Sequence, residues 1–322
     1  MLNRLSRYVF LLILCLPAAS YAWNDVGHMT IAEIAWQKLS PEDRAAVSAI
    51  LKAHPSYTTY LTADLPTGVS ADEWAFLRAS TWPDWVRSSR PGDKQFKDAT
   101  ITRYHHGPWH YINLPFTLEG APPAATQPST QPAKDFDVVS AIDANRADLK
   151  SVTKTALDRA IALSWVEHLV GDVHQPLHAT TLYSKQYPEG DKGGNDQAIL
   201  TASGVMNLHS LWDEMLGTMP NYRMVEFLAD DISADPRCDP TKQRDYATHS
   251  TPVTWASESH DDAVAFAYLE GRLKTVPMKE SKSSDVPTVP PMYLENARDV
   301  ARVRVAMAGA RLAEMIHAVL AK

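Results

Sequence analysis

Histidine and aspartate recur at one fixed spacing in two separate parts of the chain. His168 and Asp172 stand four residues apart in HLVGDVHQPLH, and His209 and Asp213 stand four residues apart in HSLWD. On a helix, residues four apart lie on one face, with their Cβ atoms about 5–6 Å from each other. Two helices that each present a His and an Asp to a shared centre can bind a divalent metal ion within a bundle.

More imidazoles join this pattern. Pro176 ends the first helix and lets His178 return toward the same point, and His110 stands between two aromatic residues. A single His-x-x-x-Asp pair is commonly an ordinary surface pair, but both pairs here stand among Leu, Val and Trp, which indicates that they point inward. Unpartnered imidazole and carboxylate groups are costly to bury, and metal coordination offsets that cost. Imidazole with carboxylate favours zinc over calcium or magnesium, which prefer oxygen ligands.

Helical patterns surround these residues, whereas strand patterns are few and weak. The N-cap signals at Ser40-Pro41 and Ser70, and the apolar periodicity around Leu157 and Trp165, predict helix starts and buried faces. We expect helices over residues 23–38, 41–51, 71–82, 207–216 and 293–320, and two more between 137 and 170. The fold class is therefore mainly α, with residues 23–322 forming a single domain.

The first 22 residues have the pattern of a secretory signal peptide. Arg4 and Arg7 precede an apolar run from Tyr8 to Leu16, and small residues end at Ala22. The run is too short to span a membrane, which takes about 20 residues. We expect cleavage after Ala22, a new N-terminus at Trp23, and an exported protein without a membrane span, in the periplasm or the medium.

The overall composition is that of a globular protein. The 322 residues are 45% apolar and 21% charged, with a formal charge of −7, which excludes disorder, collagen-like repeats and coiled coil. An acidic chain gains no bulk attraction to a phosphate backbone, so positive charge for such a substrate must be local. Cys15 leaves with the signal peptide, and Cys238 remains as a free thiol without an intramolecular partner.

With these motifs, the sequence resembles the zinc-dependent nuclease S-one/P-one family, single-strand nucleases that are related to trinuclear-zinc phospholipases C. The matching segments, in the family's order, are Trp23 to His28, Trp82 to Arg87, Trp109 to Asn113, His168 to His178 and Asn207 to Asp213. The resemblance implies a mainly α-helical globule of the phospholipase C/nuclease P-one type with three zinc ions in a cleft.

The resemblance also implies three sets of ligands, one for each Zn²⁺. The first set is Asp84, His110, His168 and Asp172. The second set is His178, His209 and Asp213. The third set is His28, Asp172 as a bridging carboxylate, and the amino nitrogen and carbonyl oxygen of Trp23. The third set implies that the site is complete only after the signal peptide is removed, because only a free, neutral amine is a ligand.

Catalytic roles follow from the same resemblance. Two zinc ions that share Asp172, one of them also held by Asp84, would lower the pKa of a bound water to near neutrality. The third ion would bind a phosphate oxygen and neutralise the leaving 3′-oxygen. Arg87 resembles the family's cationic residue beside the phosphate and would stabilise the transition state.

Substrate binding is implied at two further positions. Tyr111 stands where the family stacks an aromatic ring on an unpaired nucleobase, although an aromatic residue after a ligand can also simply pack in the core. Asn113 stands where fungal members have an Asp that contacts the base edge, and Pro83 stands where Ala is usual. These departures leave base preference open.

The implied enzyme hydrolyses single-stranded DNA and RNA to 5′-mononucleotides and acts on 3′-nucleotides as a 3′-nucleotidase. We expect a monomer without a stable protein partner. One alternative is a phospholipase C on the same scaffold, against which stands Asp213, since those lipases have Glu there. Another is a secreted zinc-binding protein without activity, against which stand Arg87 and the complete ligand set.

The remaining residues of interest receive structural roles. His174 is expected to support a neighbouring ligand or to pack in the core, and not to bind metal itself, and Trp165 and Trp212 are expected to be core residues on the ligand helices. A Pro-rich surface loop at about 117–134 is close to Tyr111 in sequence and could form the rim of the cleft. The last helix is expected to expose Arg302, Arg304 and Arg311 on a solvated face. The histidines without a pattern, expected on the surface or in the core, are His54, His105, His106, His249, His260 and His317.

Overall fold

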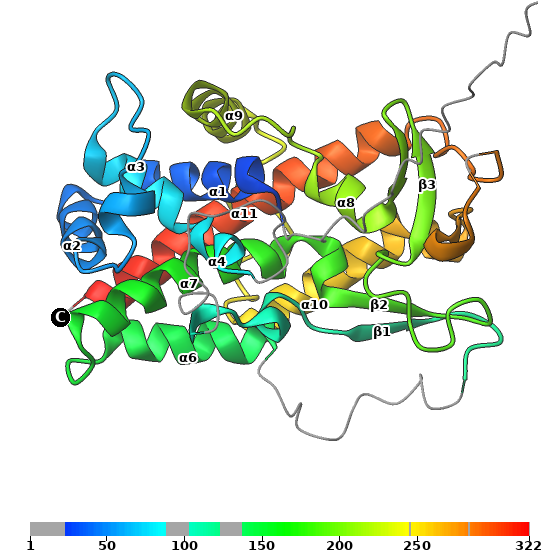
Figure 1. Ribbon diagram of the computed structural model, residues 1–322, viewed down its shortest axis with the longest axis horizontal. Helices are drawn as coiled ribbons and strands as arrows, with labels where there is room; N and C mark the ends of the chain where they lie inside the picture. Colours follow the sequence, from blue (N-terminus) through cyan, green and yellow to red (C-terminus); the bar gives the residue numbers. More distant parts are fainter. Residues whose placement is uncertain (1–22, 88–102, 123–136, 245, 283, 322) are drawn as a thin grey trace, which may run out of the picture.

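One long helix packs against three other helices in the middle of the molecule (Figure 1). The computed structural model describes residues 23–87, 103–122, 137–244, 246–282 and 284–321. In it, α7 (Ala156–His174) is packed against α1 (Asp25–Lys38), α11 (Tyr293–Leu320) and α6 (Val138–Lys150). Because α7 has neighbours on all sides, residues 162–174 are all buried, polar residues included. The described chain is mainly α-helical and forms one domain, as expected.

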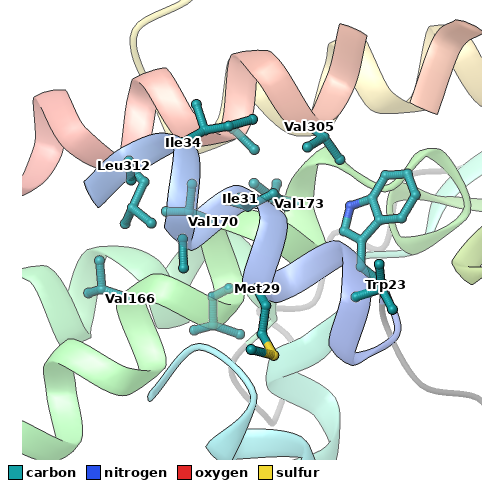
Figure 2. Packing of buried hydrophobic residues seen from close by; sticks show 14 of the residues in the cluster. Trp23, Met29, Ile31, Ile34, Val166, Val170, Val173, Val305 and Leu312 are labelled. Carbon is teal, nitrogen blue, oxygen red and sulfur yellow. The ribbon is translucent and has the colours of Figure 1, made fainter. Parts of the chain in front are cut away.

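Apolar side chains from these helices form the core (Figure 2). Ile31 and Ile34 of α1 lie in one cluster with Val170 of α7 and Leu312 of α11, and all four are at most 2% exposed. Fully burying one such side chain stabilises the fold by about 1.5–3 kcal/mol. The core therefore fixes α1 against α7, the two helices that carry His28, His168 and Asp172.

The predicted helix starts are confirmed, and two predicted ends are wrong. Ser40 and Ser70 accept the backbone N–H groups of Asp43 and Glu73 and so begin α2 (Pro41–Leu51) and α3 (Ala71–Ala79). The helix that begins after Ser70 ends at Ala79, and a separate short helix, α4 (Trp82–Trp85), follows it. Pro83 is accepted in the first turn of α4, because the N–H that a Pro lacks would have no partner within the helix at that position. The helix expected to reach residue 216 is α8 (Leu208–Asp213).

Short strands, which the sequence did not reveal, form two small sheets. β1 (Leu114–Thr117) pairs in parallel with β2 (Thr180–Tyr183). β3 (Gln197–Thr201) pairs antiparallel with β4 (Gly204–Asn207) and with β5 (Val276–Pro277). Strands of two to five residues are too short for a readable alternation of apolar and polar residues. The first sheet holds the residue before β1, Asn113, beside Thr181 of β2.

The other described elements cover the core or connect its helices. Helix α9 (Tyr222–Ala234) packs on α1, and α10 (Pro252–Asp262) packs on α7 and on the turn that follows it (Figure 1). These elements are η1 (Tyr57–Leu61), η2 (Gly107–His110), η4 (Pro176–Ala179), α9 (Tyr222–Ala234), η5 (Pro240–Lys242), α10 (Pro252–Asp262), η6 (Ala263–Ala267), η7 (Leu269–Gly271) and η8 (Met278–Glu280).

Part of the sequence prediction falls outside the described residues. The signal peptide, residues 1–22, and most of the Pro-rich segment, residues 123–134, belong to that part. Among the described helices, none combines the length and the apolar character needed to cross a membrane. Trp165, Trp212 and His174 are buried, and Cys238 is a buried free thiol, as expected.

The solvated arginine face predicted for the last helix is wrong. Arg304 and Arg311 are only 2% and 3% exposed, and Arg302 is partly buried. Glu258 on α10 accepts from both buried guanidinium groups, and Arg302 binds Asp231 and Asp235 of the α9 region. The helix sequence contains no sign of these partners, because they come from other elements.

Candidate metal centre

Six elements that are scattered in the sequence converge on one buried centre. The side chains that they contribute are at most 5% exposed. Helix α7 supplies two of them with i, i+4 spacing, and α8 supplies two more in the same way. The contributors are His28 of α1, Asp84 of α4, His110 of η2, His168 and Asp172 of α7, His178 of η4, and His209 and Asp213 of α8.

The carboxylate of Asp172 lies at the middle of this centre. Its Oδ1 is 3.3 Å from Nε2 of His28. Its Oδ2 is 3.0 Å from Nδ1 of His110 and 3.3 Å from Nε2 of His168. The two oxygens of one carboxylate thus face different imidazoles, which is the geometry of a carboxylate that bridges two ions.

Asp84, on helix α4, approaches two of the same histidines, His110 and His168. Its Oδ1 is 3.9 Å from Nδ1 of His110 and 3.8 Å from Nε2 of His168. Arg87, one turn later, donates from Nη1 to the same oxygen at 3.1 Å. This ion pair holds Arg87 beside Asp84, and Arg87 also lines a cavity next to the centre.

His178, His209 and Asp213 form a separate group. The Nε2 atoms of the two imidazoles are 3.0 Å apart, and Oδ2 of Asp213 is 3.7 Å from Nε2 of His209. Nδ1 of His178 faces the carbonyl of His110, and Nδ1 of His209 faces the carbonyl of Gly193. A carbonyl oxygen only accepts, so each Nδ1 bears the proton, and the neutral rings direct two Nε2 lone pairs at each other.

These distances and donor atoms fit bound metal ions. Ligands at about 2.0–2.2 Å from a tetrahedral zinc ion lie roughly 3.3–3.6 Å from one another. Nε2 of His28 and Oδ1 of Asp172, which face each other at 3.3 Å, are both buried without a hydrogen-bond partner. Buried polar groups are normally paired, and a cation bound by these two atoms would satisfy both of them. Three groups among the described residues are close enough to hold an ion: His28, His168 and Asp172; Asp84, His110 and His168; and His178, His209 and Asp213.

The electrostatics of the centre also favour cations. Burial lowers the pKa of His110 and of His209 to about 3, so both imidazoles are neutral and have a free lone pair. Burial, with the nearby carboxylates of Asp84 and Asp172, raises the pKa of Asp213 well above its usual value. Burial opposes charge on His168 as well, yet Asp172 and Asp84 outweigh it and raise its pKa. The carboxylates thus create a negative field at the centre.

Trp23 begins the described chain at the edge of this centre. Its side chain is fully buried against Gly27, and the N–H of the next residue, Asn24, donates to the carbonyl of Asp213 at 3.3 Å. The side chain of Asn24 caps α1 by accepting from the N–H groups of Val26 and Gly27. The backbone at residue 23 is therefore held next to the ligand helices α1 and α8.

A cavity of about 280 Å³ opens over the centre. Arg87, His110, His178 and His209 form part of its wall. Tyr111 also lines it and is 41% exposed, so its ring is not packed in the core. The amide Oδ1 of Asn113, another lining residue, accepts from the hydroxyl of Thr181 at 2.6 Å. All three residues nominated for substrate binding, Arg87, Tyr111 and Asn113, thus line one cavity.

Sequence reasoning missed the residues that orient the ligands. Nε2 of Gln175 donates to Oδ1 of Asp213 at 2.6 Å, and the carbonyl of Ser80 accepts from Nδ1 of His168 at 2.8 Å. A Cβ on Gly171 would lie 2.8 Å from Nδ1 of His28, so only glycine lets α1 approach α7 here. Gly193 has a φ of +62° and turns its carbonyl toward His209. The only sequence signals were the place of Gln175 and Gly171 in the motif and the Gly-rich loop around residue 193.

Comparisons with known proteins agree with this geometry. The family model described as S1/P1 Nuclease matches residues 23–321. Endonuclease 4 of Arabidopsis thaliana is 24% identical over 92% of this chain and 88% of its own. Endonuclease 2 of the same plant is 27% identical over 77% of both chains, and Nuclease S1 of Aspergillus oryzae is 24% identical over 62% of this chain and 56% of its own. The chain therefore belongs to the S1/P1 nuclease family, metal-dependent hydrolases of nucleic-acid phosphodiester bonds.

Proposed function

We propose that this nuclease is a secreted enzyme that binds three zinc ions and cleaves single-stranded DNA and RNA to 5′-mononucleotides. The same site removes the phosphate from 3′-nucleotides. The observation that carries this proposal is the convergence of eight buried His and Asp side chains beneath one open cavity, in three groups of which two share His168. Imidazole with carboxylate is the donor set that zinc prefers.

The bound ions would activate water and neutralise the negative charge of the phosphate and of the leaving oxygen. The oxygen of the water bonds to phosphorus and the bond from phosphorus to the 3′-oxygen breaks. One proton of the water is transferred to the leaving 3′-oxygen, so the products are a 5′-phosphate and a 3′-hydroxyl. Asp172 holds His28, His110 and His168 in a single arrangement, and Asp84 fixes Arg87 by an ion pair at 3.1 Å. The guanidinium of Arg87 is thus set at the cavity wall to bind a phosphate oxygen.

Selection of unpaired bases would depend on Tyr111. Its exposed ring lines the cavity one residue after His110, so a base stacked on it lies near the reacting phosphate. Every base has a π-face, but a paired base in a duplex has both of its faces covered by its neighbours. The ring of Tyr111 therefore favours single strands without reading their sequence.

Signal-peptide removal would complete the site. Cleavage after Ala22 gives Trp23 a free amino group, and the backbone at this residue is held beside Asp213 through the N–H of Asn24. The start of the family match at residue 23 supports the same boundary. A neutral amine and the carbonyl of Trp23 would then join His28 and Asp172 as ligands.

The test uses chain 23–322, loaded with zinc, on single-stranded DNA, single-stranded RNA, the matching DNA duplex, 3′-AMP and phosphatidylcholine vesicles. We expect chelator-sensitive release of 5′-mononucleotides from the single strands, phosphate from 3′-AMP, and slower cleavage of the duplex. A matched chain with Asp172→Asn should be inactive, and one with the exposed Asp143→Asn should be unchanged. Lipid cleavage without nucleotide release would assign the site to a phospholipase, and zinc binding with no activity on any substrate would leave only a binding protein.

A further inference from the structure

A buried charged cluster lies behind the metal centre, at the C-terminal end of α7. We define the clamp as Arg304 and Arg311 of α11 with Glu258 and Ser259 of α10. Nη1 of Arg304 donates to Oε2 of Glu258 at 2.8 Å. Arg311 donates to both oxygens of Glu258, at 2.7 and 2.8 Å. Both cations therefore share one carboxylate in the interior of the protein.

The clamp holds the last turn of α7 by its backbone. Nε of Arg304 donates to the carbonyl of His174 at 3.2 Å. The hydroxyl of Ser259 accepts from Nη2 of Arg304 at 2.6 Å and donates to the carbonyl of Val173. The last carbonyls of a helix have no partner within it, and a cation at this end also suits the helix dipole. The clamp thus occupies the two final carbonyls of α7.

A side chain of the same turn is held as well. Nη1 of Arg311 donates to Nε2 of His174 at 2.8 Å, while Nδ1 of His174 donates to the carbonyl of Val170 at 2.7 Å. Because the carbonyl of Val170 fixes the donor at Nδ1, Nε2 of His174 accepts from Arg311, and this hydrogen bond holds α7 through a side chain as well as through its backbone.

The clamped turn connects the two parts of the metal centre. Asp172 lies just before Val173, and the turn leads through Gln175 to His178. Gln175 in turn orients Asp213 by donating to its Oδ1. A displacement of the last turn of α7 would therefore move Asp172 directly and His178 and Asp213 through the following residues.

Fold stability alone does not account for such a cluster. Burying charged groups costs several kcal/mol for each ion, and well-packed apolar residues often serve stability equally well or better. The specific property of the clamp is geometric, because guanidinium donors reach backbone carbonyls on another helix at fixed angles. Apolar side chains could fill the same space, but they could not fix the position of those carbonyls.

We propose that Arg304 is a positioning residue for the metal centre, which it serves by holding the carbonyl end of α7 so that Asp172, His178 and Asp213 are set at ligand spacing. The inference rests on the proposed binding of zinc by these residues, and not on the substrate.

The test compares Arg304→Met and Arg304→Lys with a control, Arg298→Met, whose side chain is exposed on the same helix. Zinc affinity is measured by competition with a chromophoric chelator, and ligand geometry by the visible spectrum of the cobalt-substituted protein. We expect Arg304→Met to weaken zinc binding roughly 10- to 100-fold and to change the cobalt spectrum, as loss of an orienting contact does. Arg304→Lys should recover part of the affinity, and Arg298→Met should stay within about twofold of wild type.

A second variant, Ser259→Ala, tests the inference if the Arg304→Met chain does not fold. Ser259→Ala removes the donor to Val173 and one acceptor of Arg304 but leaves both arginines, so it should fold and bind zinc several-fold more weakly than wild type. Wild-type affinity and cobalt spectrum in a folded Arg304→Met chain, or in Ser259→Ala if only that chain folds, would overturn the inference. A wild-type chain that binds zinc but cleaves no nucleic acid would overturn the proposed function alone, and one that binds no zinc would overturn both.

Discussion

The Nε2 atoms of His178 and His209 lie 3.0 Å apart, and the Nδ1 atom of each ring faces a backbone carbonyl. Both Nδ1 atoms must therefore donate, so two lone pairs meet at the Nε2 atoms. That contact is repulsive unless a cation lies between them or one ring is protonated. Burial disfavours protonation, since it lowers the pKa of both rings, and the pair is therefore preorganised for a cation.

Replacement of His209 should remove one zinc ion and leave the others. His209→Asn removes the Nε2 atom that would bind the ion. The two other groups of the centre do not include this residue; they are formed by His28, Asp84, His110, His168 and Asp172. We expect elemental analysis to show one zinc ion fewer for each chain. The exposed His317→Asn is the control and should keep the wild-type content. An unchanged zinc content in the His209 variant would contradict the assignment of this group.

Replacement of Arg87 should affect turnover more than metal binding. Loss of a single donor to the charge that develops in a transition state typically lowers kcat by about 10²–10³-fold. We expect Arg87→Met to show such a loss on single-stranded DNA, with unchanged zinc content, and Arg87→Lys to show a smaller one. Steady-state kinetics together with metal analysis separate the two effects. If the Arg87→Met chain loses zinc in proportion to activity, Arg87 acts through Asp84 and not on the substrate.

Replacement of Tyr111 should weaken substrate binding and the preference for single strands. Base stacking on an aromatic ring contributes about 1–3 kcal/mol per base, so Tyr111→Ala should raise KM by roughly 5- to 150-fold. Tyr111→Phe keeps the ring and should retain the wild-type KM. The ratio of kcat/KM for single-stranded and duplex DNA is the second readout. Equal ratios in wild type and Tyr111→Ala would show that the ring does not select unpaired bases.

The carboxyl of Glu33, which is not one of the residues of the metal centre, should make the stability of the fold depend on pH. Burial, together with Glu73, Glu226 and Asp230, raises its pKa to about 7 from an ordinary value of 4.5. The pKa of Glu33 in the folded protein thus lies above its pKa in the unfolded chain. The protonated acid therefore stabilises the fold fully below about pH 4.5, and this stabilisation is lost as pH rises through about 7.

Glu33→Gln should remove this loss. In urea unfolding of the zinc-free protein, we expect the variant to exceed wild type by roughly 1–3 kcal/mol at pH 8 and by much less at pH 5. The exposed Glu119→Gln is the control and should follow wild type at both values. A constant difference between Glu33→Gln and wild type across this range would contradict the assigned pKa.

The sequence was most informative where one helix carries the whole signal. His168 with Asp172, and His209 with Asp213, could be paired because a single helix fixes the i, i+4 relation. The start of α11 and its end at Leu320 were also predictable, since its composition is uniformly helical. His110 was added to these pairs as an imidazole between two aromatic residues, whereas His28 and Asp84 came from the family resemblance, because spacing along the chain does not reveal them.

What could not be predicted depends on contacts between distant elements. Arg304 and Arg311 look like a charged helix face, and only the approach of Glu258 on α10 makes their burial tolerable. Gln175 looks like a turn residue, yet it reaches Asp213 on α8. Sequence periodicity records which face of an element is apolar, but not which charged partner another element brings to it.

The central claim is that the three groups around Asp172 and His209 each hold a zinc ion. A crystal structure of chain 23–322 grown with zinc, with anomalous diffraction recorded on both sides of the zinc absorption edge, tests it directly. We predict three anomalous peaks, each about 2.0–2.2 Å from its nitrogen and oxygen ligands, with one peak between His178 and His209 and two on opposite sides of the Asp172 carboxylate. Fewer peaks in the centre, or peaks bound by other residues, would contradict the account.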